Sequence, residues 1–482
     1  MHIKVIFRVI GLLVMVFSLA FIPPLLVAII YQDETINAFL YALLINIVGG
    51  FLMWFPFRGK KQELRIRDGF IITVLFWFVL GLFGSFPFML TDFRSLSFTD
   101  ALFESISGLT TTGATILSSI DTMPKSILFY RQQLQWLGGM GIIVLAVAIM
   151  PMLGVGGMQL YRAETPGPVK DSKLTPRIAE TAKALWYIYA SLTVLCALGF
   201  WLAGMTLFDA ICHSFSTVAI GGFSTHDASI GFYDSYAIEL ICIAFMLISA
   251  INFGLHFFAW RNRSVLHYFK DPEVKFFLFI LFCTISIAII VLMLSTSYDW
   301  SLAVRFALFE AVSIATTTGF STEDFSSWPG ALPFLLVVTS FAGGCASSTG
   351  GGMKVIRILL ILKQGFRELQ RLVHPNAIIP VKLGGKAISE RVISGVWGFF
   401  SAYLLVYVLL MIGLMSVGLD QLSAWSAVAA TLNNLGPGLG QVSSNFSAIS
   451  DPAKWILCFS MLLGRLEVFT LLVLFTPMFW KR

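Results

Sequence analysis

Four short stretches of this 482-residue chain carry residue types that suit the binding of a dehydrated cation. Each stretch aligns back from one glycine without gaps. The first reads Ala101-Leu-Phe-Glu-Ser-Ile-Ser-Gly-Leu-Thr-Thr-Thr-Gly113, and the third reads Ala307-Leu-Phe-Glu-Ala-Val-Ser-Ile-Ala-Thr-Thr-Thr-Gly319. The second ends in Ala219-Ile-Gly-Gly222, and the fourth ends in Asn433-Asn-Leu-Gly436. The glycines recur about every 100–115 residues, which indicates one structural unit used repeatedly.

These residue types fit the chemistry of an ion-binding loop. A cation that has left its water shell must regain oxygen ligands, and backbone carbonyls supply them without a full charge. Glycine tolerates the unusual φ/ψ values that turn a run of carbonyls toward one axis. The alternative is four glycine turns on the outer surface. Four turns in register, each after an amphipathic segment too short to span, favour a ring of ion ligands instead.

The elements that must position these loops are membrane helices. The chain is 57% hydrophobic and only 12% charged, which is too apolar for a soluble fold. About ten segments reach the roughly 20 residues that a spanning helix needs. They are 4–30, 36–57, 69–91, 126–152, 183–205, 234–260, 275–297, 332–362, 391–418 and 453–478.

We therefore expect an all-α integral membrane protein with about ten transmembrane helices. Four pseudo-symmetric repeats, each a helix, a pore loop and a second helix, would surround a central pore. Two extra N-terminal helices occupy 1–60. The four pore repeats occupy 61–165, 166–272, 273–375 and 376–482.

Basic residues predict the topology. They cluster at 58–67, 162–183, 261–275 and 354–391, and all four clusters face the cytoplasm if both termini are cytoplasmic. The net charge of +6 reflects this bias, so we expect no nucleic-acid partner. Beyond topology, the 354–391 cluster suits anionic membrane lipid or an acidic partner surface.

A glycine-rich stretch interrupts the predicted span 332–362. Glycine costs roughly 1 kcal/mol per residue against alanine inside a helix, so this helix should break. We expect an intramembrane gate loop across the pore, although close helix packing through small residues is an alternative. The gate residues are Gly343, Gly344, Cys345, Ala346, Ser347, Ser348, Thr349, Gly350, Gly351 and Gly352.

A single arginine, Arg465, lies near the middle of the last predicted span. A charge at this depth is costly and usually faces the interior of the bundle. Glu467 lies two positions away on another helix face and is a poor partner. We expect Arg465 to face the pore below the loops, contact the gate and repel cations when the pore is closed. A structural pairing elsewhere is the alternative.

The chain resembles the Trk/Ktr/HKT superfamily of potassium transporters, and specifically its bacterial TrkH type, over essentially its whole length. The resemblance rests on the two extra N-terminal spans and on the motifs Thr-Thr-Thr-Gly-Ala-Thr, Ile-Gly-Gly-Phe-Ser-Thr, Thr-Thr-Thr-Gly-Phe-Ser-Thr and Asn-Asn-Leu-Gly-Pro-Gly. It implies a K⁺ uptake subunit of the bacterial inner (plasma) membrane. It also implies a homodimer with one pore per subunit, and a cytoplasmic nucleotide-binding regulatory subunit of the TrkA type.

The resemblance further implies which residues bind K⁺. They are Thr111, Thr112, Gly113, Ile220, Gly221, Gly222, Thr317, Thr318, Gly319, Asn434, Leu435 and Gly436. The fourth loop departs from the other three, with Asn433 and Asn434 before its glycine and Pro437 after it. We therefore expect fewer well-formed ion sites, and weaker discrimination between K⁺ and Na⁺, than in a tetrameric channel filter.

Two other function classes were weighed. A symporter that couples K⁺ to H⁺ or Na⁺ is the alternative function, and such proteins usually carry membrane-embedded carboxylates or histidines. Glu467 is the one acid that we place well inside a span, while Glu104, Glu310 and His213 occupy matching positions on the predicted pore helices. A membrane enzyme would need a metal cluster, a nucleophile–base pair or a nucleotide loop. The sequence predicts none of these, and it predicts no cofactor apart from K⁺ as the transported ion.

Overall fold

The computed structural model describes residues 2–59, 65–91, 96–141, 178–296 and 298–481. The described chain is helical, with one two-stranded hairpin that pairs β1 with β2. Its helices and strands are α1 (Ile3–Ser18), α2 (Ile22–Tyr31), α3 (Ile36–Trp54), α4 (Ile66–Gly84), α5 (Phe86–Leu90), α6 (Phe98–Leu109), α7 (Lys125–Trp136), α10 (Ile178–Leu202), α11 (Leu207–Ala219), α12 (Tyr236–Ala250), α13 (Phe253–Arg261), α14 (Leu266–Lys270), α15 (Pro272–Ser295), α16 (Trp300–Ala315), α17 (Leu332–Thr339), α18 (Val355–Val373), β1 (Lys382–Leu383), β2 (Lys386–Ala387), α19 (Glu390–Ser416), α20 (Gln421–Leu432), α21 (Asp451–Arg465), α22 (Phe469–Leu472) and α23 (Pro477–Trp480).

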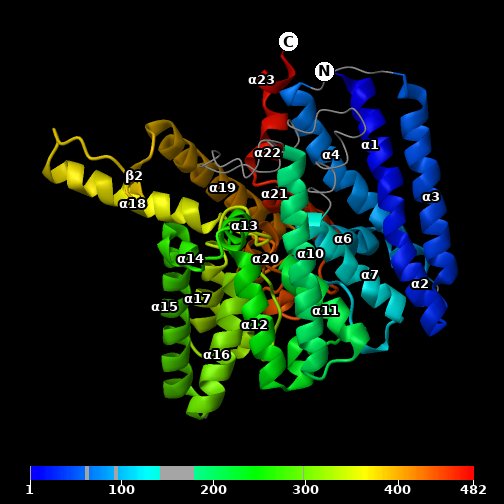
Figure 1. Cartoon of the computed structure of the whole chain (residues 1–482), viewed down its shortest axis with the longest axis horizontal. Coiled ribbons are helices and arrows are strands. Elements are labelled where there is room, and N and C mark those ends of the chain that lie inside the picture. Colours follow the sequence, from blue (N-terminus) through cyan, green and yellow to red (C-terminus); the bar gives the residue numbers. More distant parts are fainter. Residues whose placement is uncertain (1, 60–64, 92–95, 142–177, 297, 482) are drawn as a thin grey trace.

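Six helical stretches among the described residues are long and apolar enough to cross a membrane. They are Ile3–Tyr31, Ile36–Phe57, Arg67–Leu90, Lys183–Leu202, Pro272–Ser295 and Glu390–Ser416, and they match six predicted spans to within a few residues. The predicted span 126–152 begins as α7, and its end lies outside the described residues. Both ends of the chain lie at the same end of the molecule (Figure 1).

Two predicted spans are bent rather than straight. The span predicted at 234–260 turns by 95° between α12 and α13. Helix α12 ends at Ala250, and Asn252 caps the start of α13, since its side-chain oxygen accepts from the Gly254 backbone N–H at 2.8 Å. The span predicted at 453–478 turns by 106° after α21, where Glu467 and Val468 take left-handed φ values of 51° and 55°. For these two segments the prediction of a continuous helix was wrong.

The predicted break in 332–362 is confirmed. Helix α17 ends at Thr339 and α18 begins at Val355, with non-helical backbone between them. Figure 1 shows α18 projecting sideways from the molecule, across the direction of α15 and α12.

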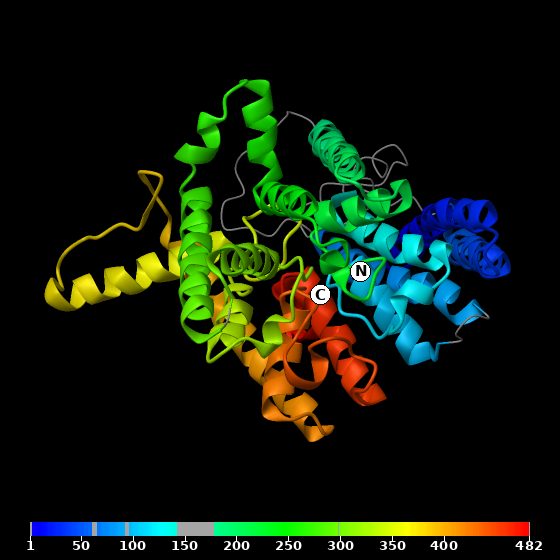
Figure 2. The same cartoon turned by 90° about the horizontal axis from the view of Figure 1, so that it is seen from below.

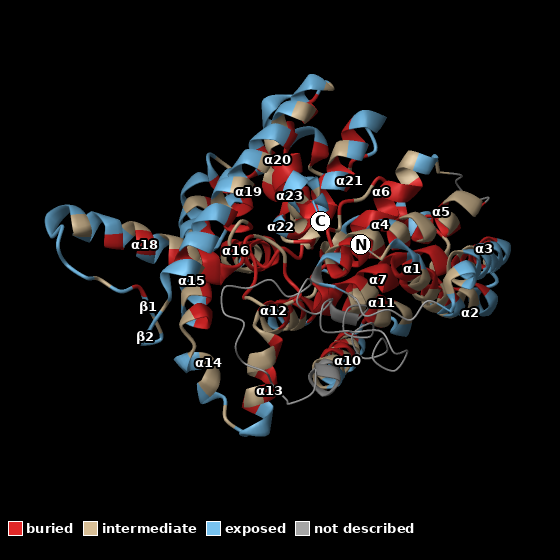
Figure 3. Ribbon diagram, turned by 90° about the horizontal axis from the view of Figure 1, so that it is seen from above, coloured by how far each residue is buried: buried red, intermediate tan, exposed pale blue. Residues whose placement is uncertain are grey.

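Four short helices of 12 to 16 residues, α6, α11, α16 and α20, lead into the glycine loops. Each has a side-chain oxygen at its N-cap that accepts the backbone N–H three residues later. The capping residues are Ser97, Thr206, Asp299 and Asp420. Figure 3 shows buried residues concentrated at the centre of the molecule, where these helices lie, and exposed residues at its edge.

Candidate functional site

The four glycine loops, residues 110–113, 219–222, 316–319 and 433–436, share one backbone shape. In each loop the last glycine and the residue two before it both have positive φ. The pairs are Thr111 (56°) and Gly113 (80°), Ile220 (55°) and Gly222 (78°), Thr317 (68°) and Gly319 (80°), and Asn434 (53°) and Gly436 (102°). In each loop a backbone N–H reaches back five residues to a helix carbonyl, from Thr112, Gly221, Thr318 and Leu435. This is the Schellman end of a helix, formed four times over.

The loops meet in a closed ring. A Cβ added to Gly113 would lie 2.1 Å from the Gly221 carbonyl oxygen in the second loop. A Cβ added to Gly222 would lie 2.1 Å from the Thr318 carbonyl oxygen, and one added to Gly319 would lie 2.1 Å from the Leu435 carbonyl oxygen. A Cβ added to Gly436 would lie 2.7 Å from the Thr112 carbonyl oxygen, which closes the ring. Figure 2 shows the corresponding parts of the chain arranged in order around a common centre. Glycine is required at all four positions because both the φ value and the neighbouring backbone exclude a side chain.

The arrangement favours a cation at the ring. All four short helices end at the loops, so the negative ends of their dipoles converge there. The loop residues are almost fully buried: Thr112, Thr318 and Leu435 are each 0% exposed. A ring of backbone carbonyls beside four helix C-termini is an electrostatic environment for a monovalent cation without fixed negative charge.

The threonine hydroxyls already have partners within the protein. Thr112 is hydrogen-bonded to Thr110 at 2.7 Å and accepts from the Asn434 side chain at 2.9 Å. The Thr317 hydroxyl accepts from the Gly351 backbone N–H at 2.7 Å. These side chains therefore hold the loops to one another and to the segment beneath them, which leaves ion binding chiefly to the backbone.

The segment 343–352, which was predicted to be a gate, lies against the ends of three of the short helices. The Thr349 hydroxyl donates to the Val218 carbonyl of α11 at 3.1 Å. The Gly352 N–H donates to the Asn433 carbonyl after α20 at 3.0 Å. Gly350 sits so close to α16 that an added Cβ would lie 3.1 Å from the Thr316 carbonyl. The segment therefore bonds to carbonyls at the ends of α11 and α20 and packs against the end of α16.

The rest of the gate segment is held from the side. The Cys345 N–H donates to the Ala250 carbonyl at 2.8 Å, at the bend between α12 and α13. One carboxylate oxygen of Glu273 accepts from the backbone N–H groups of Ala346 at 2.7 Å and Ile356 at 3.1 Å. The Lys354 ammonium donates to the Gly350 carbonyl. Gly343, Gly344, Ser347, Ser348 and Gly351 complete the segment.

Arg465 lies at the end of α21, beside the first loop. Its guanidinium donates to the Thr111 hydroxyl at 3.3 Å and to the carbonyls of Gly138 and Gly139, in the π-helical turn Leu137–Gly141. The contacts with Gly138 and Gly139 are a structural pairing of the kind given as the alternative, while a position facing the pore and a contact with the gate stay predictions. Glu467 pairs with Arg357 of α18.

A polar face of α7 braces the second loop, and the sequence analysis missed it. The Gln135 side chain donates to the Gly221 carbonyl at 2.6 Å and accepts from the Phe223 N–H at 3.1 Å, while Gln132 donates to the Phe223 carbonyl at 3.0 Å. Arg131, on the same helix, is 1% exposed and pairs with Glu104 at 2.7 Å. The sequence pattern that could have predicted this brace is the presence of Arg131, Gln132 and Gln135 on one face of a predicted membrane span.

The titratable residues at matching positions of the short helices support the chain that returns from each loop. Glu104 accepts from the Ile116 N–H at 3.1 Å, and Glu310 accepts from the Thr322 N–H at 2.7 Å. His213 is hydrogen-bonded to the Ser224 hydroxyl at 2.9 Å. Each of these three groups binds a backbone or side-chain atom 11 or 12 residues further along the chain. They therefore hold the returning chain against its own short helix.

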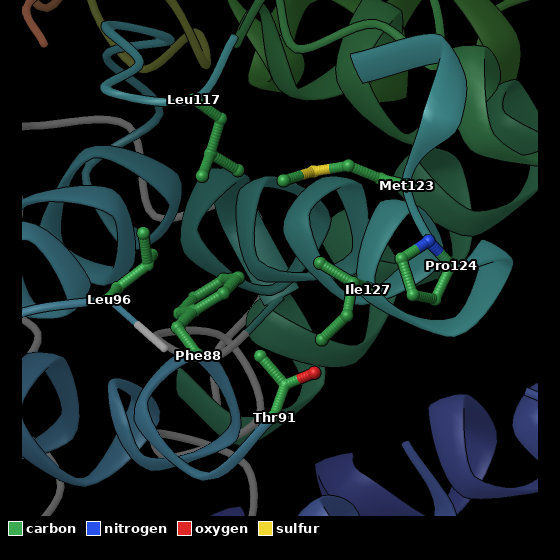
Figure 4. Close-up of a pocket in the computed structure, with 7 residues that line it drawn as sticks. All are labelled: Phe88, Thr91, Leu96, Leu117, Met123, Pro124 and Ile127. Atoms are coloured by element: carbon green, nitrogen blue, oxygen red, sulfur yellow. The ribbon is translucent and has the colours of Figure 1, made fainter. Parts of the chain in front are cut away.

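A small hollow lies elsewhere in the protein (Figure 4). It is lined by Phe88, Thr91, Leu96, Leu117, Met123, Pro124 and Ile127. Thr91 is the single hydroxyl-bearing residue in this lining, so the hollow offers few ligands to an ion. The glycine-loop ring remains the candidate site.

Comparisons with known proteins identify the family of this chain. Residues 35–482 match the family model TrkH, described as a cation transport protein. The chain is 61% identical to the Trk system potassium uptake protein TrkH of Halomonas elongata and 57% identical to that of Escherichia coli, with 100% of both chains covered in each case. The crystal structure of the potassium transporter TrkH from Vibrio parahaemolyticus covers the whole chain with a TM-score of 0.91 and 57% identity. The chain belongs to the TrkH family of cation transport proteins.

Proposed function

We propose that this protein carries K⁺ across the bacterial inner membrane through a pore at the ring of glycine loops. The observation that carries this proposal is the cyclic approach of Gly113, Gly222, Gly319 and Gly436 to the carbonyls of their neighbouring loops. The ring carbonyls replace the water shell of the ion. The names of the relatives, which are potassium uptake proteins, support K⁺ as the ion.

The proposed architecture has four pseudo-symmetric repeats around the pore, about ten membrane crossings and cytoplasmic termini. The common Schellman ends, N-caps and positive-φ positions of the four short helices support a shared structural unit. The position of both termini at one end of the molecule is consistent with one cytoplasmic side (Figure 1).

Residues 343–352 and Arg465 form the gate. The segment binds the helix-end carbonyls of Val218 and Asn433, which are the groups that attract a cation leaving the ring. Arg465 adds a positive charge beside Thr111 at the same level. In this arrangement the segment blocks the path and the guanidinium repels the ion.

The proposed partners are a second copy of the chain, a cytoplasmic regulatory subunit of the TrkA type and membrane lipid. The word "system" in the names of the relatives is consistent with a protein of several components. The basic cluster 354–391 is the proposed docking surface for the regulatory subunit, together with 162–183, most of which lies outside the described residues.

Coupled transport finds less support among the described residues. A proton relay needs carboxylates or histidines that are free to titrate along the pathway. Glu104 is paired with Arg131, and Glu310 accepts backbone N–H groups. Both carboxylates therefore make bonds within the protein, Glu310 through Oε1 alone.

Planar-bilayer recording of the purified protein tests this function. We expect currents that follow the K⁺ gradient, with a reversal potential that does not move when a pH gradient is imposed. A reversal potential that shifts with the proton gradient would establish symport instead. Absence of K⁺ flux under every condition, with and without the regulatory subunit, would refute the proposal.

A further inference from the structure

The fourth glycine loop differs from the others at its first position, and this difference has a structural consequence. Thr110 and Thr316 occupy that position in the first and third loops, where each is hydrogen-bonded at 2.7 Å to the threonine two residues later in its own loop. The fourth loop has Asn433 there and Leu435 two residues later. Leucine has no hydroxyl, so the Asn433 amide is available for bonds outside the loop.

The Asn433 side chain uses both of its polar atoms outside the loop. Its nitrogen donates to the Ser340 hydroxyl at 2.9 Å, directly after the end of α17. Its oxygen accepts from the Tyr403 hydroxyl of α19 at 2.5 Å. All three residues are buried, with Asn433 and Ser340 at 0% and Tyr403 at 3% exposed. An amide can do this because it is both donor and acceptor, whereas a threonine has a single hydroxyl.

The Asn433 backbone reaches the other end of the gate segment. Its carbonyl accepts from the Gly352 N–H at 3.0 Å. Gly352 in turn lies so near the start of the segment that an added Cβ would be 2.6 Å from the Ser340 carbonyl. One residue, adjacent to the proposed ion-binding position Asn434, therefore bonds to Ser340, which lies three residues before the gate segment, and to Gly352, which ends it.

We propose that Asn433, oriented by Tyr403, is the positioning residue that latches the gate segment to the fourth loop and holds the pore closed. This inference rests on the proposed function, because it requires that residues 343–352 move when the pore opens. The bond to Gly352 joins the loop to the segment, and the bond to Ser340 joins the loop to the chain that leads into the segment, so both stabilise the closed arrangement and break on opening. Because Tyr403 belongs to α19, which packs against α18, movement of these helices reaches the latch through one hydroxyl.

The chain provides a matched control for Tyr403. Tyr407 lies one turn further along α19, is 5% exposed and donates its hydroxyl to the Trp425 carbonyl of α20 at 2.6 Å. The rings of both tyrosines contact Phe341. Replacement of either by phenylalanine keeps the ring and removes one buried hydrogen bond, but only Tyr403→Phe removes a bond to Asn433.

The test is K⁺ efflux from liposomes that contain the full-length protein without a regulatory subunit. Loss of one hydrogen bond of ordinary net strength changes a two-state equilibrium about fivefold. We expect Tyr403→Phe and Ser340→Ala each to raise resting K⁺ efflux by about fivefold, while Tyr407→Phe stays within about twofold of the unaltered protein. The melting temperatures of the two tyrosine variants should fall alike, because each loses one buried bond. A purely structural role for Tyr403 would move melting temperature without moving efflux.

Unchanged or lower efflux in folded Tyr403→Phe and Ser340→Ala would overturn the latch, as would equal efflux in Tyr403→Phe and Tyr407→Phe. If Tyr403→Phe yields no folded protein, Ser340→Ala decides. Arg465→Ala separates this failure from failure of the gate itself. If Arg465→Ala raises efflux and the latch variants do not, the gate stands and the latch is wrong. If none of these variants changes efflux, both are wrong.

Discussion

Substitution of a ring glycine tests whether close packing of the four loops sets ion selectivity. Gly222 has a φ of +78°, and a Cβ added there would lie 2.1 Å from the Thr318 carbonyl oxygen. In Gly222→Ala, the left-handed conformation costs roughly 1–2 kcal/mol for a residue with a Cβ. The Cβ and the carbonyl oxygen must also separate by about 0.9 Å to reach the 3.0 Å below which such contacts are essentially absent. The ring therefore opens between the second and third loops.

Gly330→Ala is the matched control. Gly330 has a φ of +63°, and an added Cβ would meet nothing within 4 Å. This variant carries the same conformational cost without the contact. The assay is the reversal potential of the purified protein in a planar bilayer with K⁺ on one side and Na⁺ on the other. We expect the K⁺/Na⁺ permeability ratio to fall about tenfold in Gly222→Ala, equivalent to about 1.4 kcal/mol of lost preference for K⁺. In Gly330→Ala the K⁺/Na⁺ permeability ratio should equal that of the unaltered protein.

The reasoning would be refuted by a folded, conducting Gly222→Ala protein with the permeability ratio of Gly330→Ala. Contact between neighbouring backbones would then not determine which ion passes. A loss of ratio in both variants would equally refute it, because a common effect would be due to backbone strain and not to the ring.

The remaining predictions concern the gate charge, a buried pair, an outer-loop histidine and the ring as a whole. Arg465→Ala should increase K⁺ efflux from liposomes, because it removes a positive charge beside the loops; unchanged or reduced efflux at normal expression contradicts an electrostatic barrier. Arg131→Ala should lower the free energy of unfolding by about 3–5 kcal/mol, because it leaves Glu104 as an unpaired buried charge. A thermal melt measures this loss. The double variant Arg131→Met/Glu104→Gln should recover part of the stability, because it removes both charges. Burial lowers the pKa of His226, but the nearby carboxylates of Asp209, at 3.7 Å, and Asp121, at 2.6 Å, outweigh it and raise the pKa above its usual value. The resulting stabilisation of the folded protein is complete below about pH 6.5 and is lost as the pH rises through the raised pKa. The melting temperature of the unaltered protein should therefore fall over that pH range. In Asp121→Asn the fall should be smaller, because one of the two carboxylates that raise the pKa is removed. The reversal potential should also indicate weaker K⁺/Na⁺ discrimination than a tetrameric channel filter has, and very high selectivity would contradict the effect assigned to the fourth loop.

Local patterns predicted the elements of this protein well. Runs of apolar residues predicted six spans that the structure contains, since the length of such a run and the thickness of a bilayer together determine where a helix can cross. The glycines of 343–352 predicted the break between α17 and α18, since each removes side-chain packing and increases the backbone entropy cost of a helix. The gap-free alignment of the four glycine motifs predicted that the loops share one shape. A positive φ restricts the choice of residue at its own position, so glycines at the same offset indicate the same backbone turn.

The sequence alone determined membrane insertion, the short helices and the positions where the backbone turns, because hydropathy, capping and φ preference act within a few residues. Only the tertiary structure decided which groups bond across the ring. Gln135 braces Gly221 from 86 residues away, and Asn433 binds Ser340 from 93 residues away. The bends after Ala250 and Arg465 likewise depend on partners brought from other helices. Hydrogen bonds between residues so distant in the chain depend on where packing places each backbone, and no local pattern carries that information.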